Sequence, residues 1–193
     1  TLEVSVSASG KIVPAVEEII TSPVSARIVE VYRRSGDSVE AGTPLLKLDL
    51  QSTETEYHKQ LDEERMKQLQ LDQLRMNNET YLGDLAMKVK VQAMKVGRME
   101  ADLRNERYLD SLGSGTTDRV RQAELAYNTG CLELEQLRQQ YANEQKVKEA
   151  DLKVKQLELD IFRKSLSETR RTLEDAQLRS PRKAILTSIN TQV

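Results

Sequence analysis

Near the middle of the chain stands the stretch GSGTTD, residues 113–118. Two closely spaced glycines readily end a helix, and the threonine and aspartate residues after them are good N-cap residues for a new one. We therefore predict one helix over about residues 51–112 and a second over about 117–178. Because the break divides the helical region almost evenly, it predicts an antiparallel hairpin with its tip at residues 113–116.

The composition around this break favours long helices. No proline occurs from Leu45 through Ser180, and the stretch is rich in Leu, Glu, Gln, Lys and Arg. Long helices require such a run, because proline breaks a helix interior and these residues have high helix propensity. At a rise of 1.5 Å per residue, each predicted helix is on the order of 90 Å long.

Apolar residues in both predicted helices recur every seven residues, as in a coiled coil. The first helix carries one such series, Leu82, Val89, Val96 and Leu103, with Leu85 and Met99 near the second position of the seam. The second helix carries two, Val120, Tyr127, Leu134 and Tyr141, and then Leu152, Leu159, Leu166 and Leu173, with Phe162 and Ala176 beside them. The offset between these two series is a four-residue stutter, which locally unwinds the supercoil. We predict a two-stranded antiparallel coiled coil.

The flanks of the helical region differ from it and resemble each other. Residues 1–49 are rich in Val and Ile, are punctuated by Gly and Pro, and predict short strands with turns. Ser22-Pro23 recurs 158 positions later as Ser180-Pro181, and Ala26, Ile28 and Val31 recur as Ala184, Leu186 and Ile189. We predict one small β-domain of two similar halves, with the hairpin inserted between them. By the same offset the second half extends to about position 207, so we expect this sequence to be a piece of a larger protein.

Charge and cysteine content exclude several classes of protein. The 29 basic and 31 acidic residues nearly cancel, which predicts no nucleic-acid partner. A single cysteine excludes a disulfide framework within the chain and a multi-cysteine zinc site. No apolar run approaches the roughly 20 residues of a membrane-spanning helix.

The candidate chemical groups do not assemble into a catalytic pattern. His58 and Glu54 form at most a two-ligand clip, whereas a zinc site needs three or four ligands. Cys131 has no histidine at catalytic spacing, so we expect a partly packed thiol. The glycines of residues 113–115 lack the strand and lysine of a phosphate loop. We expect no enzyme activity, no metal site and no cofactor.

Several stretches of the flanks resemble a known motif. Residues 22–31 (SPVSARIVEV), 36–39 (GDSV) and 42–46 (GTPLL) resemble the first half of a biotinyl/lipoyl-type motif. Split by a long helical hairpin and followed by RSP at residues 179–181, this half-motif resembles the periplasmic adaptor, or membrane fusion protein (HlyD-like), family of bacterial efflux pumps and secretion systems.

The resemblance implies a mainly α-helical protein with a small β part. Residues 1–14 would lead as a strand from a β-barrel or membrane anchor, and residues 15–50 would form the first half of a lipoyl-like domain. Residues 51–178 would form the α-helical coiled-coil hairpin, and residues 179–193 would begin the second half of the domain.

The resemblance also implies a function. A family member of this kind links an inner-membrane transporter (ABC, RND or MFS type) to an outer-membrane duct of the TolC type, in a tripartite efflux pump or a type I secretion system. It would act in the periplasm as a homo-oligomeric ring of three or six copies whose hairpins form a tubular wall. A membrane anchor would lie outside this fragment.

Family adaptors that meet the duct carry a pattern at the hairpin tip: Arg-Leu, then Leu, Ser, an aliphatic residue and Ala. Aligning Thr116 with the serine places Leu109 on the leucine before it and Val120 and Ala123 on the aliphatic and Ala positions after it, with residues 105–106 (Asn-Glu) on the Arg-Leu pair. The resemblance thus implies the following duct-docking residues: Arg104, Arg107, Leu109, Thr116, Val120 and Ala123. The alternative is that Leu109 and Val120 are ordinary seam residues and that Thr116 only caps the second helix.

Two other functions stay open. A lipoyl or biotin carrier of an enzyme complex would carry a modified lysine between its two halves, and an intact unmodified mass would exclude it. A plain coiled-coil scaffold, with the repeat a coincidence, is the third possibility. It fails if the termini prove adjacent and the two flanks pair as one β-fold.

Overall fold

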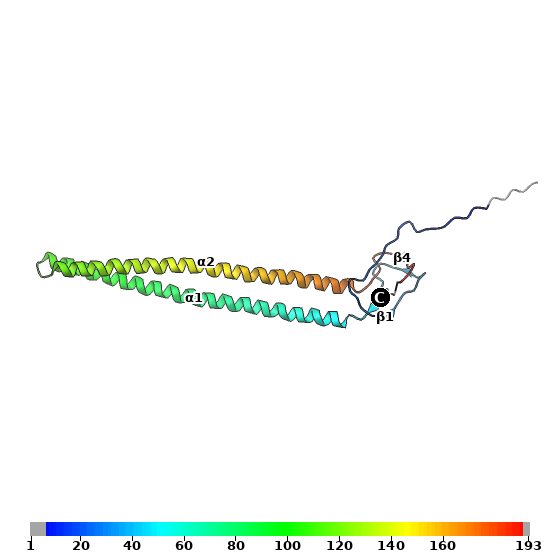
Figure 1. The fold of residues 1–193 in the computed structure, drawn as a ribbon, viewed down its shortest axis with the longest axis horizontal. Helices are drawn as coiled ribbons and strands as arrows, with labels where there is room; N and C mark the ends of the chain where they lie inside the picture. Colours follow the sequence, from blue (N-terminus) through cyan, green and yellow to red (C-terminus); the bar gives the residue numbers. More distant parts are fainter. Residues whose placement is uncertain (1–6, 191–193) are drawn as a thin grey trace, which may run out of the picture. The chain divides into compact units, whose positions relative to one another are not determined.

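The computed structural model describes residues 7–190 and contains two long helices and four short strands (Figure 1). In chain order these are β1 (Ile28–Val31), β2 (Ser38–Val39), β3 (Leu46–Leu48), α1 (Gln51–Ser111), α2 (Thr117–Asp175) and β4 (Ala184–Ile185).

The chain divides into two compact units. One comprises the hairpin from His58 to Leu166, and the other comprises both flanks together with the ends of the helices that join them.

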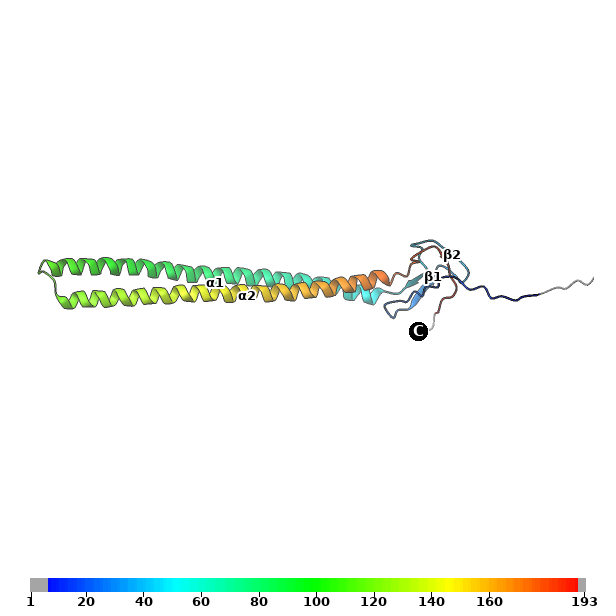
Figure 2. The ribbon, with the colours of Figure 1, turned by 90° about the horizontal axis from the view of Figure 1, so that it is seen from above.

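Both predicted helices are present, and in the hairpin unit they lie side by side (Figures 1 and 2). Helix α1 ends one residue before the predicted boundary, and α2 ends three residues before it. Helix α2 ends early because the chain after Asp175 pairs with the first flank, where the Leu45 amide donates a hydrogen bond to the Leu178 carbonyl. Residues 176–178 therefore leave the helix.

The predicted seam is confirmed by burial. Leu85 and Leu103 on α1, and Leu134, Leu159 and Leu166 on α2, are buried, and Leu159 is only 1% exposed. The remaining members of the predicted heptad series are half-buried. The seam is narrow, so each helix buries one stripe of apolar side chains, which is the packing of a coiled coil.

One of the two seven-residue series that form the seam of α1, the series that contains Leu85 and Met99, alternates between apolar and polar residues. Its polar members stand fourteen residues apart, at Glu64, Asn78, Gln92 and Glu106, which is about 21 Å along the helix. The first three are matched by α2: Arg163 donates to Glu64 at 2.7 Å, Asn78 donates to the Lys148 carbonyl at 3.3 Å, and Gln92 donates to the Gly130 carbonyl at 3.2 Å. Of these residues Asn78 and Gln92 are buried, and buried polar contacts favour one register of two helices over the others.

Glycines inside the two helices fall into two groups. A Cβ added to Gly130 would lie 2.7 Å from the Met99 sulfur, so this glycine permits a close approach of α1 to α2. A Cβ at Gly83 or at Gly97 would meet no atom within 4 Å, and both glycines are exposed.

We therefore expect Gly83→Ala and Gly97→Ala to stabilise the hairpin, each by up to about 1 kcal/mol, because alanine is the better helix former. Urea unfolding followed by circular dichroism at 222 nm measures the change. Gly130→Ala serves as the contrast and should gain less, because the Met99 side chain must move. A loss of stability in either exposed-glycine variant would contradict this interpretation.

The two flanks pair with each other. Strand β2 of the first flank pairs antiparallel with β4 of the second flank, and Val39 lies opposite Ala184. Within the first flank, β1 pairs with β3, with a bulge between Ile28 and Glu30. Further backbone hydrogen bonds join the flanks, among them Gly42 N–H to the Ser180 carbonyl at 2.7 Å and Gly36 N–H to the Leu186 carbonyl at 2.6 Å. Val39, Leu45 and Ala176 form the small core of this unit.

The internal repeat is visible in the two Ser-Pro turns. The Ser22 hydroxyl donates to the Val24 carbonyl at 2.7 Å, and the Ser180 hydroxyl donates to the Arg182 carbonyl at 2.6 Å. The strands do not follow the repeat: residues 186–189, the equivalents of β1, form no strand. Strand β1 is held by β3, and the described residues contain no second copy of β3.

The strand expected within residues 1–14 stays a prediction, since the structure describes only residues 7–14 of that segment. Residues 7–14 have no regular secondary structure, and Ile12 is 99% exposed. A strand needs a neighbour to receive its backbone hydrogen bonds, and no described strand lies beside this segment. The valines at positions 4 and 6 lie outside the described residues.

Candidate functional site

The turn between the helices is built on two glycines. Gly113 has a φ of 75°, the left-handed conformation that usually ends a helix at glycine. The Leu109 carbonyl accepts hydrogen bonds from the Ser114 and Gly115 amides at 3.0 and 3.1 Å. A Cβ on Gly115 would lie 2.8 Å from the Asp110 backbone nitrogen, so the tip is too tight for a side chain there.

Thr116 caps the second helix. Its hydroxyl oxygen accepts a hydrogen bond from the Arg119 amide at 3.3 Å, and its carbonyl accepts one from the Val120 amide at 3.3 Å. The hydroxyl thereby satisfies one of the amides that lack a partner at a helix start. The side chain is exposed, but its hydroxyl is already engaged by the chain itself.

The other predicted docking residues have partners within the hairpin. Leu109 and Val120 are half-buried at the end of the seam. Arg104 lies 3.5 Å from a carboxylate oxygen of Glu100, and Arg107 lies 3.5 Å from one of Glu124 on the opposite helix. These are exposed ion pairs and hold the arginines weakly.

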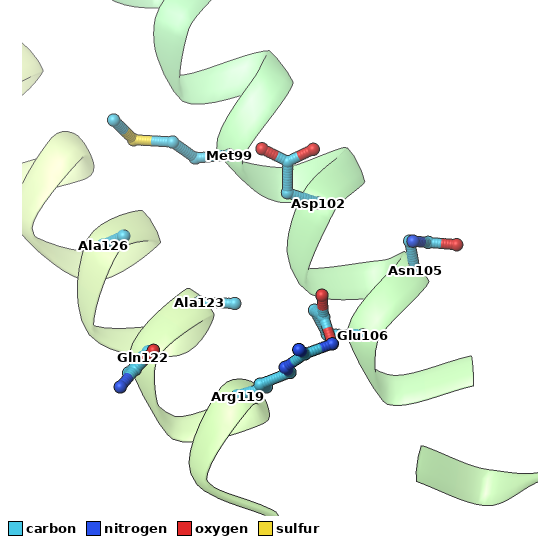
Figure 3. Close-up of a pocket in the computed structure, with 8 residues that line it drawn as sticks. All are labelled: Met99, Asp102, Asn105, Glu106, Arg119, Gln122, Ala123 and Ala126. Carbon is cyan, nitrogen blue, oxygen red and sulfur yellow. The ribbon is translucent and has the colours of Figure 1, made fainter. Parts of the chain in front are cut away.

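The structure has a groove of about 450 Å³ between α1 and α2 near the tip (Figure 3). Four residues of each helix line it: Met99, Asp102, Asn105 and Glu106 from α1, and Arg119, Gln122, Ala123 and Ala126 from α2. Of the six predicted docking residues, only Ala123 belongs to this groove. In Figure 3 its methyl group points into the space between the helices, and Arg119 reaches toward Glu106.

Glu106 is the unmatched member of the polar series on α1. One of its carboxylate oxygens is buried and has no hydrogen-bond partner among residues 7–190. Leaving a buried acceptor without a donor costs about 1–3 kcal/mol, and more for a charged group. The three other polar members are hydrogen-bonded to α2, and elsewhere on α1 the Gln60 side-chain oxygen is likewise buried without a partner among the described residues.

Sequence reasoning missed this part of the site. Because residues 105–106 were aligned with an Arg-Leu pair, the arginines at 104 and 107 were predicted as docking residues and Glu106 was not. The fourteen-residue spacing of Glu64, Asn78, Gln92 and Glu106 was the available signal, since it marks a polar series within the seam. Ala123 and Ala126, three residues apart on one helix face, were the second signal.

The remaining candidate groups are scattered. His58 is exposed on α1, and the described residues hold no group of three or more His, Cys, Asp or Glu side chains arranged for a metal ion. Cys131 is half-buried, as expected for a partly packed thiol. A hydrogen bond with this thiol raises the pKa of the Tyr127 phenol above its usual value.

The pairing of the flanks bears on the scaffold alternative. A plain coiled coil gives no reason for β2 and β4 to pair, whereas a split domain requires it. Among the described residues, neither helix has an apolar stretch of the length and hydropathy needed to cross a membrane.

The chain has a distant likeness to a solved structure, while two comparisons of its sequence found no match. No protein-family model matches the sequence, and no curated protein matches it. A solved structure of the periplasmic adaptor protein EmrA is 15% identical over 91% of this chain, with a TM-score of 0.37. The chain spans 66% of the length of that structure.

Proposed function

We propose that this chain is part of a periplasmic adaptor, and that the tip of its hairpin docks on an outer-membrane duct of the TolC type. The observation that carries the proposal is the groove at the tip end of the hairpin, with its unmatched Glu106. It is supported by the hairpin being inserted between two flanks that pair with each other.

The chemistry of the groove suits a partner helix. Ala123 and Ala126 present only methyl groups, so a neighbouring helix can approach the backbone closely. A hydrogen-bond donor on that helix would satisfy Glu106 once the side chains around it rearrange, and a charge-assisted bond of this type is stronger than a neutral one. The exposed Arg104 and Arg107 do not line the groove, but their ion pairs are weak enough for them to exchange partners with a docking protein.

The rest of the proposed role follows the family that the sequence resembles. The flanks would form a lipoyl-like domain without a prosthetic group, several copies would form a ring, and an inner-membrane transporter would be the second partner. The protein would be anchored to the inner membrane and would act by assembly, with no catalysis and no cofactor.

The docking proposal is tested with a photo-cross-linkable residue in the groove. Placed at Ala126 of the full-length protein in living cells, it should capture an outer-membrane duct protein, identified by mass spectrometry. The matched control is Ala142, which is also an exposed alanine of α2 but lies away from the groove. Capture of the duct equally at both positions, or at neither, would contradict tip docking.

A further inference from the structure

The polar series on α1 begins and ends with a glutamate that faces an arginine of α2. At one end of the series, Arg163 donates a hydrogen bond to Glu64 at 2.7 Å. At the tip end, Arg119 lines the groove together with Glu106 and reaches toward it (Figure 3). Within residues 7–190, however, no ion pair joins Arg119 to Glu106. The same pair of charges is thus closed at one end of the series and open at the other.

Arg119 and Glu106 lie at the same level of the hairpin. In the next polar layer of α1, the Gln92 amide donates across the seam to a carboxylate oxygen of Glu133 at 3.2 Å. The numbers of these two residues add to 225, and those of Glu106 and Arg119 also add to 225. Because the two helices run antiparallel with the same rise per residue, equal sums mark residues that are level across the seam.

Helix stability gives no reason for an arginine at position 119. The residue lies in the first turn of α2, where its amide donates to the Thr116 hydroxyl at 3.3 Å. The start of a helix is electropositive, so this turn favours an anion such as Asp118 and disfavours a cation. Among the described residues Arg119 has no ion pair that would offset this cost, and it is exposed. Its side chain is therefore available for a role outside its own helix.

From this arrangement we infer that Arg119 is a latch on the groove. In its closed position the guanidinium binds the Glu106 carboxylate, as Arg163 binds Glu64. In its open position, which the structure holds, the arginine leaves the carboxylate unpaired. An arginine can bind both oxygens of a carboxylate through two parallel hydrogen bonds. The closed latch therefore takes the acceptor that a partner helix needs and fills the space in front of Ala123.

The inference rests on the proposed function and adds the regulation of the same groove. An ion pair with an exposed arginine is weak, so the closed and open positions are both populated and a partner helix can displace the arginine. A partner that binds only the open position has its apparent affinity reduced by the fraction of molecules that are open. Removing the latch should therefore strengthen docking, whereas removing a residue that contacts the partner should weaken it.

The pairing is tested first without a duct, in the whole chain of 193 residues. Glu106→Gln, Arg119→Gln and the double variant are unfolded with urea and followed by circular dichroism at 222 nm. We expect a coupling between the two substitutions that changes the unfolding constant about two- to five-fold at low ionic strength. This coupling should shrink in 1 M salt, because salt screens exposed charges. Any effect of Arg119→Gln on the start of α2 itself cancels in the cycle.

The matched control is the cycle of Glu106→Gln with Arg121→Gln, since Arg121 is another exposed arginine of α2 that does not line the groove. The effects of these two substitutions should be additive. Additive effects in the cycle with Arg119 as well, or equal coupling in both cycles, would overturn the inference.

The effect of the latch on docking is then measured by duct capture at Ala126 in the full-length protein. Arg119→Gln should raise the captured fraction about two- to five-fold, because the groove is always open. Arg121→Gln should leave it unchanged. A fall in capture with Arg119→Gln would show that the arginine contacts the duct itself, and it would overturn the latch.

Failure here is distinguishable from failure of the proposed function. Duct capture at Ala126 that Arg119→Gln does not change would leave tip docking intact and remove the latch. The absence of capture from the unsubstituted protein and from both arginine variants would contradict docking, and it would overturn the regulatory role of Arg119 even where the cycle shows pairing.

Discussion

Leu159→Asp is expected to unfold the hairpin, lowering its free energy of unfolding by about 4 kcal/mol or more. Leu159 is a seam residue of α2 and is only 1% exposed. Truncating such a leucine to alanine costs about 2–5 kcal/mol, and a buried carboxylate without a partner adds a desolvation penalty. Because a typical domain is stable by only about 5–15 kcal/mol, this single change removes much of the total.

The measurement is urea unfolding of the whole chain, followed by helical circular dichroism at 222 nm. Leu157→Asp is the matched control: the same substitution two residues earlier, at a side chain that is 59% exposed. In dilute solution, Leu157→Asp should change the free energy of unfolding by no more than about 0.5 kcal/mol. Equal losses from the two variants would show that the assigned seam is not the buried one.

Leu45→Asp is expected to unfold the unit formed by the two flanks while the hairpin stays folded. Leu45 is 6% exposed; its amide donates to the Leu178 carbonyl at 3.0 Å, and its carbonyl accepts from the Tyr32 amide at 2.9 Å. We expect a loss of about 3 kcal/mol or more for this unit, because the substitution buries a carboxylate in a core of only a few side chains.

Hydrogen exchange separates the two units. The Gly36, Gly42 and Leu186 amides, which bond across the flanks, should exchange at least about a hundred-fold faster in the variant. Amides between His58 and Leu166 should keep their protection. Lys47→Asp, at an exposed position of β3, serves as the control and should leave the flank amides protected. Loss of protection throughout the hairpin would contradict the division into two units.

The sequence predicts the helices well because their signals are local and repeated. The absence of proline, the glycines at residues 113 and 115 and the seven-residue spacing of seam residues each require no knowledge of distant contacts. The flanks were harder to predict. Short strands depend on partners far along the chain, and only the Ser22 and Ser180 turns behaved as the repeat predicted.

For the candidate site, the sequence predicted a hairpin tip at residues 113–116 but not the groove beside it. Thr116 and Val120 belong to the tip as expected, but they serve the cap and the seam. That Leu109, Arg104 and Arg107 contact a duct stays a prediction. Inside the hairpin, Leu109 is half-buried and the two arginines form exposed ion pairs.

Sequence by itself thus determined that this chain folds into two long helices returning on each other, because periodic apolar spacing specifies which face of a helix is buried. The tertiary structure decided which polar residues find a partner. Glu64, Asn78 and Gln92 meet donors or acceptors on α2, whereas Glu106 has an oxygen that does not. This depends on the register of α2 against α1, a long-range quantity that no local pattern encodes.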